Sequence, residues 1–197
     1  ASFMTAINIA SSMDKAVARK FDATHYDIDI AFSKAYEKLQ IEQTIRQVEG
    51  IKITETWGNV IATTLTSADT QGRKLRIIAP LIGTALSPSP PITAGRWLKD
   101  GDTNAIVMNT ALMDTFKIEA SIGDTVYLII SGETTSWTLV GTTQEFMNLV
   151  AYVPYDTLTG LKGYQSNTVV KVEDRAATDT VTRNLEVHLQ DAGYDVY

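Results

Sequence analysis

The sequence predicts an α+β fold in which a split βαβ (ferredoxin-like) subdomain carries an inserted small β-rich subdomain. The first observation behind this prediction is a strand–helix–glycine–strand pattern that occurs twice, over residues 27–56 and 167–197. The second is that the residues between the two copies change in texture to hairpin patterns with little helix. Two strand–helix–strand units are the components of an antiparallel sheet with helices on one face. The two ends of the chain should therefore build one subdomain around an insertion.

The first copy begins with a strand over residues 27–32, where polar and apolar residues alternate as in a half-buried strand. Ser33 is the expected N-cap of the helix that follows. Gly50 stands where a left-handed residue stops a helix, and the next strand runs over residues 51–56. The predicted apolar face of this helix consists of Ile41, Ile45 and Val48.

The second copy repeats this order with a strand over residues 167–172, a helix and a closing strand over residues 194–197. Asp174 is the expected N-cap and Gly193 the expected stop of the helix. The predicted apolar face of this helix consists of Val181, Leu185, His188, Leu189 and Ala192.

The middle of the chain is predicted to form a small barrel or sandwich of short strands. Residues 51–67 and 74–79 should pair as a hairpin through a turn at residues 69–72. The run Ser87–Pro91 cannot adopt regular structure, because proline lacks the N–H donor and has a fixed φ, and it marks a boundary. The other expected elements are strands over residues 105–108, 125–131 and 136–142, a helix over residues 110–116, and a strand over residues 152–155 that Pro154 places near a sheet edge.

These elements divide the chain into two expected subdomains. Residues 1–82 and 162–197 form the split βαβ subdomain, and residues 83–161 form the inserted β-rich subdomain.

The composition is that of a globular protein, and it disfavours several functions. Of the 197 residues, 44% are hydrophobic and 20% are charged, and the formal net charge is −6. An acidic chain is poorly suited to nucleic acid, because phosphate contacts need clustered Lys and Arg. The densest basic stretch, Arg73–Arg76, alternates as expected for the solvent side of a strand. The absence of cysteine excludes disulfides, thiol catalysis and cysteine metal sites.

The N-terminal residues resemble the trimmed end of a longer element. Residues 1–10 are apolar, lack the basic start of a signal peptide, and run into the charged stretch Asp14–Lys20, with helix favoured over residues 1–20. We expect the chain to be a fragment of a larger protein, although a plain amphipathic helix at the N-terminus is the alternative. No apolar run in the sequence is long enough to span a membrane.

No motif in the sequence calls for catalysis, a cofactor or a metal. The two histidines, His25 and His188, are expected to be a surface residue and a packing residue. Asp27 and Asp29 share one face of a strand, and without a third partner they are expected on its wet side. The turn residues Asp100, Asp102 and Asp124 lack the alternating ligands of a calcium loop and fit ordinary turn chemistry.

Four residues are the candidate partner or inter-subdomain contacts. Arg96 and Trp97 follow the proline-rich run, where the tryptophan either anchors the insert to the core or stands exposed as a contact residue. Tyr152 and Tyr155 flank Pro154 and form either an exposed aromatic edge or part of the core.

A string of short motifs in one order resembles a known family. The motifs are His25–Ser33, Val48–Gly50, Gly95–Leu98, Asn104–Asn109, Ile122–Val126, Trp137–Gly141 and Ala151–Tyr155. Together they resemble the extracytoplasmic, or periplasmic core, domain of FtsX/MacB-type ABC transporter permeases, and the resemblance covers nearly the whole chain.

This resemblance implies a porter-like subdomain made from both ends of the segment and a small inserted β-rich subdomain. It implies that residues 1–20 continue the first membrane helix outward, at the extracytoplasmic face of the bacterial cell membrane. It also implies that the domain transmits movement driven by a cytoplasmic ATP-binding subunit or domain and docks an extracytoplasmic partner or substrate. The family carries no catalytic residues in this domain.

Two other functions are compatible with the sequence. The domain could be a soluble module that holds a small apolar ligand or peptide between its two subdomains, where pockets are common. A hydrolase with an unrecognised site is the third hypothesis, and it requires a cleft with convergent titratable groups.

Overall fold

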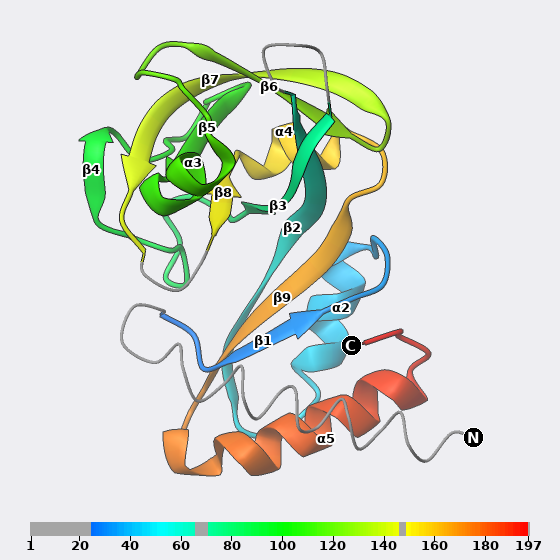
Figure 1. The fold of residues 1–197 in the computed structure, drawn as a ribbon. Helices are drawn as coiled ribbons and strands as arrows, with labels where there is room; N and C mark the ends of the chain where they lie inside the picture. Colours follow the sequence, from blue (N-terminus) through cyan, green and yellow to red (C-terminus); the bar gives the residue numbers. More distant parts are fainter. Residues whose placement is uncertain (1–24, 66–70, 146–148, 197) are drawn as a thin grey trace.

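The computed structural model describes residues 25–65, 71–145 and 149–196. A barrel lies above a smaller sheet with two helices, and the long strands β2 and β9 run from one part to the other (Figure 1). The elements are, in chain order, β1 (Ile28–Ala31), α2 (Lys38–Ile45), β2 (Ile51–Leu65), β3 (Gln71–Ala79), β4 (Ile92–Gly95), β5 (Ala105–Asn109), α3 (Thr110–Phe116), β6 (Thr125–Ile130), β7 (Glu133–Thr143), β8 (Val150–Tyr152), α4 (Tyr155–Thr159), β9 (Gln165–Val172), the 3-10 turn η1 (Arg175–Ala177) and α5 (Thr178–Asp191).

The lower part, formed by β1, α2, the first half of β2, β9 and α5, has the predicted split βαβ arrangement. Strand β9 pairs antiparallel with both β1 and β2, so the two strands of the first copy run parallel with β9 between them. On the other side of β1, Val196 bridges Phe32 in antiparallel fashion. The resulting order is that of a ferredoxin-like sheet, which confirms the predicted fold class. The expected closing strand over residues 194–197 is reduced to this one bridge in the described part of the chain.

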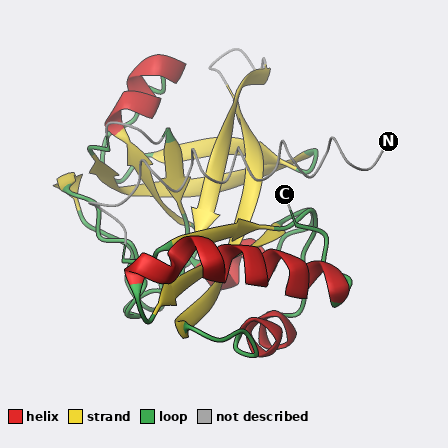
Figure 2. Ribbon diagram, turned by 90° about the horizontal axis from the view of Figure 1, so that it is seen from below, coloured by secondary structure: helices red, strands yellow, loops and turns green. Residues whose placement is uncertain are grey.

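Helices α2 and α5 cover one face of the lower sheet, as Figure 2 shows from below. Alternation along β1 and β9 places Ile28, Ile30 and Val170 on that face, opposite the apolar stripe of α5. The core of the lower part consists of Ile28, Ile30, Phe32, Ile41, Ile45, Val48, Val170, Val172, Val181, Leu185 and Leu189.

The upper part is a closed barrel. Its pairings run β2–β3–β8–β5–β7–β6 and return from β6 to β2, which closes the ring. Strand β4 is added outside the ring on β7. The pairs β3–β8 and β5–β7 are parallel, and the other pairs are antiparallel. The barrel is filled around Trp137, which is 2% exposed and whose indole N–H donates to Thr135 Oγ1 at 2.8 Å.

Strand β2 belongs to both parts. Its first half pairs with β9, and from Gly58 onward it pairs with β3. A Cβ at Gly58 would lie 3.0 Å from Leu158 Cδ2, so the glycine lets α4 pack close to the strand. The β3 residues Leu75 and Ile77 belong to the barrel core. Packing thus groups β3 with the barrel, while the division into residues 1–82 with 162–197 and residues 83–161 stays a prediction.

The predicted helix caps are only partly correct. The cap at Ser33 is wrong, because α2 begins at Lys38 without a side-chain cap, and the Ser33 N–H donates to the Asp195 carbonyl at 3.1 Å. Gly50 has φ of 89° but lies in the turn after α2, where a Cβ would approach Val181 at 3.0 Å. Gly193 directly follows the C-cap of α5 with φ of 84°, as predicted.

The N-terminal cap and the apolar face of α5 also differ in detail. Asp174 caps η1, which leads into α5, by accepting from the Ala176 N–H. Ala192 is exposed, contrary to the prediction. His188 is half-buried and lies 3.2 Å from Gln47 Oε1 through its Nε2.

The predicted edge strand over residues 152–155 is wrong. Strand β8 lies between β3 and β5, and Pro154 follows it at the N-cap position of α4. The helix predicted over residues 1–20 and the first half of the turn predicted at residues 69–72 lie outside the described residues, while Gln71 and Gly72 already belong to β3. Among the residues described, no helix is both long and apolar enough to cross a membrane.

Candidate functional site

An open groove of about 560 Å³ lies where two loops and the start of α4 meet at the barrel. Its walls come from the loop after β3, the loop between β4 and β5, and the start of α4. The lining is mixed, with prolines and aliphatic side chains beside carboxylates. Its apolar members include Pro80, Leu81, Ile82 and Pro154, and its charged members are Lys99, Asp100, Asp102 and Asp156.

The candidate Arg96 shapes one wall of this groove through Asp102. Its guanidinium donates from both terminal nitrogens to the two carboxylate oxygens, at 2.8 and 2.9 Å. The Lys99 N–H donates to the same carboxylate at 3.0 Å. The hydrogen bonds from Arg96 hold the pKa of Asp102 below its usual value. The loop from residue 97 to residue 102 is therefore closed by a two-pronged ion pair, and Asp102 serves the turn rather than a metal.

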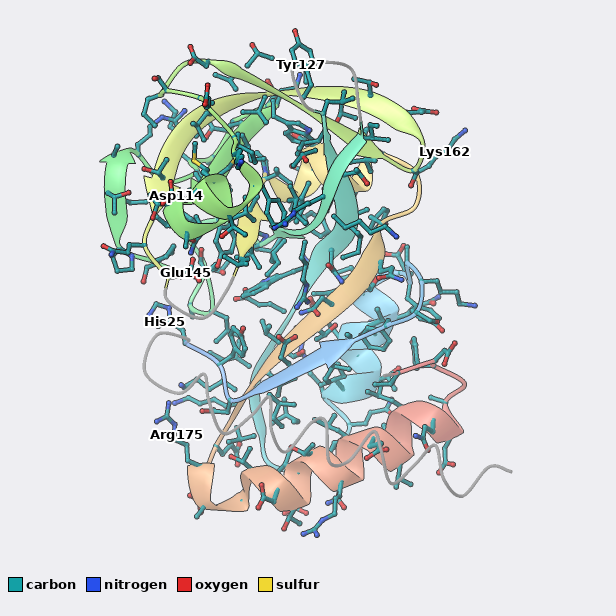
Figure 3. The ribbon with its side chains drawn as sticks, viewed as in Figure 1. His25, Asp114, Tyr127, Glu145, Lys162 and Arg175 are labelled. Carbon is teal, nitrogen blue, oxygen red and sulfur yellow. The ribbon has the colours of Figure 1, made fainter. Side chains whose placement is uncertain are left out.

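The candidates Trp97 and Tyr152 lie against each other. Their rings meet edge to face with centroids 5.0 Å apart, and Leu98 and Val107 pack in the same cluster. The Tyr152 hydroxyl donates to Glu145, which Figure 3 marks at the lower rim of the barrel, at 2.9 Å. Burial and the Glu145 charge raise the pKa of this hydroxyl well above its usual value. Trp97 thus ties the loop after β4 to the central strand β8.

The candidate Tyr155 is the first residue of α4 and lines the groove. It is half-buried, and burial is the main cause that raises the pKa of its hydroxyl. The Lys38 ammonium of α2 lies 5.7 Å from the centre of its ring. A helix of the lower part therefore reaches a side chain of the groove.

Comparison with known proteins identifies the family. The model of the MacB-like periplasmic core domain matches residues 1–187. The chain belongs to this family. No match was found among curated proteins.

Two solved structures share the fold of this MacB-like domain. The periplasmic region of MacB from Actinobacillus actinomycetemcomitans aligns with a TM-score of 0.52 and 15% identity, over 92% of each chain. The extracellular domain of the noncanonic ABC-type transporter YknZ from Gram-positive bacteria aligns with a TM-score of 0.52 and 16% identity, over 86% of this chain and 99% of that one.

The resemblance predicted from the motifs is confirmed. The chain is an extracytoplasmic domain of a MacB/FtsX-like ABC transporter permease, on the periplasmic or extracellular side of the membrane. Membership in this family implies a parent with membrane helices and an ATPase partner. It places the chain among transporter domains rather than in a known class of enzyme.

A row of hydrogen-bonded polar side chains, Asp29, Asn167, Arg76 and Asn59, crosses the junction between the lower part and the barrel of the MacB-like domain, from β1 to β3. We call this junction the waist. Asp29 accepts from Asn167 at 2.7 Å, and the same asparagine accepts from Arg76 at 3.2 Å. Arg76 also donates to Asn59 at 3.1 Å. The prediction that Arg76 lies on the solvent side of a strand is therefore wrong, since its guanidinium joins the two parts of the domain. Asparagines inside strands are uncommon, and Asn59 and Asn167 were the available sequence signal.

The prediction that Asp27 and Asp29 lie on a wet face is wrong for Asp27, while Asp29 is half-buried and bonded to Asn167. Asp27 is 5% exposed and both of its carboxylate oxygens accept hydrogen bonds, from the Val172 N–H and from Arg175. Glu42, another buried carboxylate, covers an open stretch of β2 by accepting from the Thr56 N–H at 2.9 Å. Asp27 and Glu42 thus accept hydrogen bonds from backbone N–H groups of β9 and β2.

The other candidates have local roles. His25 is exposed, and its Nδ1 lies 3.0 Å from the Ser87 carbonyl. Asp124 accepts from the Ser121 N–H in a turn. Among the residues that the structure describes, no three His, Cys, Asp or Glu side chains cluster as metal ligands would. The structure brings Arg96, Trp97 and Tyr152 together and places Tyr155 in the groove, and their role as partner contacts stays a prediction.

Proposed function

We propose that this domain passes ATP-driven movement of its parent permease to the groove, where an extracytoplasmic partner protein or substrate docks. Its partners would be the membrane helices that flank it in the parent, the ATP-binding subunit or domain that acts through them, and the docked molecule, with no role for nucleic acid. The observation that carries this proposal is the continuity of the two parts: β2 runs through both, paired with β9 in the lower part and with β3 and β6 in the barrel.

Continuity favours transmission because strands do not bend freely between two packed cores. Each half of β2 is held by neighbours, β9 below and β3 with β6 above. The Arg76 side chain adds cross-links to Asn59 and Asn167 at the change of partner. A displacement of the lower part should therefore carry the barrel with it as one body.

The test of transmission is a pair of spin-label distances in the reconstituted parent permease with its ATPase. One label replaces the exposed Asp114 on α3, and the other stands at the cytoplasmic end of a membrane helix. We expect the distance distribution to shift between the nucleotide-free and ATP-trapped states. An unchanged distribution would contradict transmission.

A second function has one observation in its favour, which is the size of the groove. Its volume of about 560 Å³ lies within the range of small-molecule sites, roughly 300–1,000 Å³. A small apolar ligand or peptide could occupy it. Thermal-shift screening against lipids and hydrophobic compounds tests this function, with Tyr155→Ala as the variant that should lose any shift. Absence of a shift with every compound class would count against ligand binding.

A further inference from the structure

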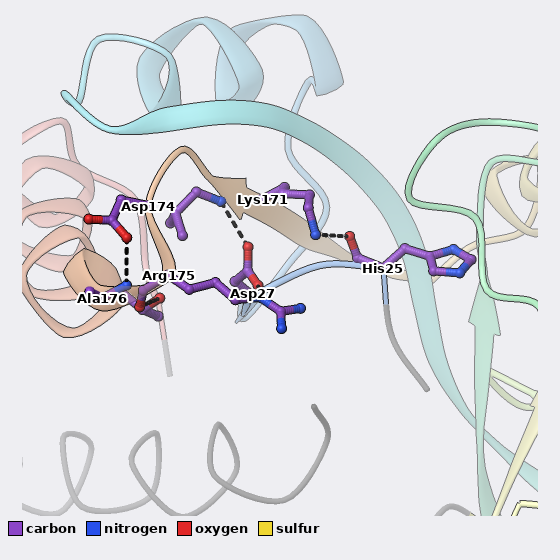
Figure 4. A network of polar contacts seen from close by, with 8 residues as sticks. His25, Asp27, Lys171, Asp174, Arg175 and Ala176 are labelled. Carbon is purple, nitrogen blue, oxygen red and sulfur yellow. Dashed lines mark hydrogen bonds and ion pairs between the residues drawn. The ribbon is translucent and has the colours of Figure 1, made fainter. Parts of the chain in front are cut away.

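The point where the described chain enters the domain is bonded to β9 and to the turn before α5. The Asp27 N–H donates to the Val170 carbonyl at 2.8 Å. Its carboxylate accepts from the Val172 N–H and from Arg175 Nε, both at 3.0 Å (Figure 4). The side chain of Asp27 is fully buried, so its bond to the Val172 N–H is shielded from water, whereas Arg175 is 59% exposed and the ion pair lies at the surface. Asp27 is thereby fixed by its backbone and by both carboxylate oxygens.

Arg175 is held in place by its own turn. Asp174 accepts from the Ala176 N–H at 3.0 Å, and the Thr178 hydroxyl donates to the Arg175 carbonyl at 2.8 Å. This turn leads directly into α5. A pull on Asp27 therefore acts on the first turn of α5 as well as on β9.

The two residues before Asp27 reach the proline-rich loop. His25 Nδ1 lies 3.0 Å from the Ser87 carbonyl, and the His25 carbonyl accepts from Lys171 at 3.2 Å. Tyr26 meets Trp57 edge to face with centroids 5.6 Å apart, in the cluster that buries Leu86 completely. The chain entry and the loop over residues 80–91 are thus packed together.

The same loop forms one wall of the groove. Leu81 and Thr84 line the groove, while Leu81 also packs in the Tyr26–Trp57 cluster. The Thr84 hydroxyl donates to Glu55 of β2 at 2.8 Å. The loop therefore contacts the lower part of the domain with one side and lines the groove with the other.

From these contacts we infer that residues 25–27 are a joint that couples the chain before residue 25 to the width of the groove. Movement of that chain displaces His25 and Tyr26, these displace the loop over residues 80–91, and the wall of the groove moves. Asp27 gives the movement a fixed point on β9 and α5. The inference rests on the proposed function for the source of the movement, because it specifies how docking would be regulated.

The joint can be tested in the 197-residue chain, without membrane or ATP. The chain has no cysteine, so two exposed positions can be labelled: Ala85→Cys, next to the groove residue Thr84, and Asp100→Cys, in the wall formed by the loop between β4 and β5. In Asp27→Asn only one oxygen remains to accept, and Arg175→Gln removes the ion pair. We expect amide exchange at Val172 to become at least tenfold faster in Asp27→Asn. The distance distribution across the groove should become at least twice as wide in both variants.

Two further variants keep the result interpretable. Arg183→Gln removes an exposed positive charge from α5 and should leave the distribution unchanged. His25→Ala removes an exposed contact with the loop, so it should widen the distribution even if the Asp27 variants fail to fold. Faster exchange at Val172 with an unchanged distribution, or an unchanged distribution in His25→Ala, would overturn the inference.

The inference and the proposed function fail in different ways. A groove that does not respond to the joint variants in the isolated chain refutes the joint and leaves transmission untouched. An absent ATP-dependent shift in the parent permease refutes transmission, whatever the joint does.

Discussion

The barrel and the lower part differ in how the backbone hydrogen-bonding groups at their strand edges find partners. Every strand of the ring that forms the barrel has two neighbours, because β6 returns to β2. In the lower part, the one pairing on the outer side of β1 among the described residues is the Phe32–Val196 bridge, and the Glu42 side chain takes the place of a neighbouring strand at Thr56. A closed ring resists deformation, whereas an open sheet held by side chains can yield at its edges. In the function proposed above, movement would therefore enter through the lower part, and the barrel would follow as a rigid unit.

The largest effect is expected for a substitution in the core of the barrel. Trp137→Ala should lower the free energy of unfolding by about 3–5 kcal/mol, because it leaves a cavity in the packed centre of the ring. Urea unfolding followed by circular dichroism measures the loss. A loss below about 1 kcal/mol would show that the barrel is not filled around this side chain.

The matching test in the lower part is Leu185→Ala on α5. Leu185 is 2% exposed in the core beneath the sheet, so the expected loss is about 2–5 kcal/mol. Val187→Ala is the control on the same helix, since Val187 is 58% exposed and its truncation should cost little. Equal losses for the two variants would contradict the assignment of the buried face of α5.

The waist is tested by Arg76→Met, which keeps much of the side-chain volume and removes the donors. Asn59 and Asn167 would each lose a hydrogen bond at 7% and 2% exposure, so we expect a loss of about 1–3 kcal/mol. The control is Lys74→Met, an exposed residue on the same strand and the same face. If the two variants have equal stability, the row of polar side chains does not join the two parts.

The smallest expected effect concerns the pH dependence of the Arg96–Asp102 pair. The folded-state pKa of Asp102 lies below its unfolded value of about 3.9, so its contribution is complete above that pH and is lost as the pH falls through the folded-state pKa. Since Arg96 is 41% exposed, we expect Asp102→Asn to cost less than about 1 kcal/mol at neutral pH.

The measurement is urea unfolding of Asp102→Asn and wild type from neutral pH down to about pH 2. The stability difference should shrink in acid. Asp114→Asn, an exposed carboxylate on α3, is the control that should show no comparable trend. A difference that grows as the pH falls would contradict the assigned pairing.

The sequence predicted the elements whose signal is local. Alternation in residues 27–32 and the spacing of Val181, Leu185 and Leu189 identified a strand and a helix face that the structure contains. The turn at Gly193 followed from the conformational freedom of glycine after a helix. The family resemblance also came from short local motifs, and the comparisons confirm it.

Features that depend on long-range pairing could not be predicted. Barrel closure needs β6 to meet β2, which lies more than sixty residues earlier in the chain. Arg76 and Asp27 have the pattern of exposed residues, and only the tertiary structure gives them buried partners. Pro154 favours an edge by itself, but β8 ends before it. The groove likewise depends on two loops and a helix end from separate parts of the chain.

The central claim is that the barrel and the lower part form one body, and differential scanning calorimetry of the 197-residue chain tests it most directly. The claim predicts a single transition whose calorimetric and van't Hoff enthalpies agree, with Trp137→Ala and Leu185→Ala each lowering the midpoint of that same transition. Two separable transitions, with Trp137→Ala shifting only one and Leu185→Ala only the other, would contradict it.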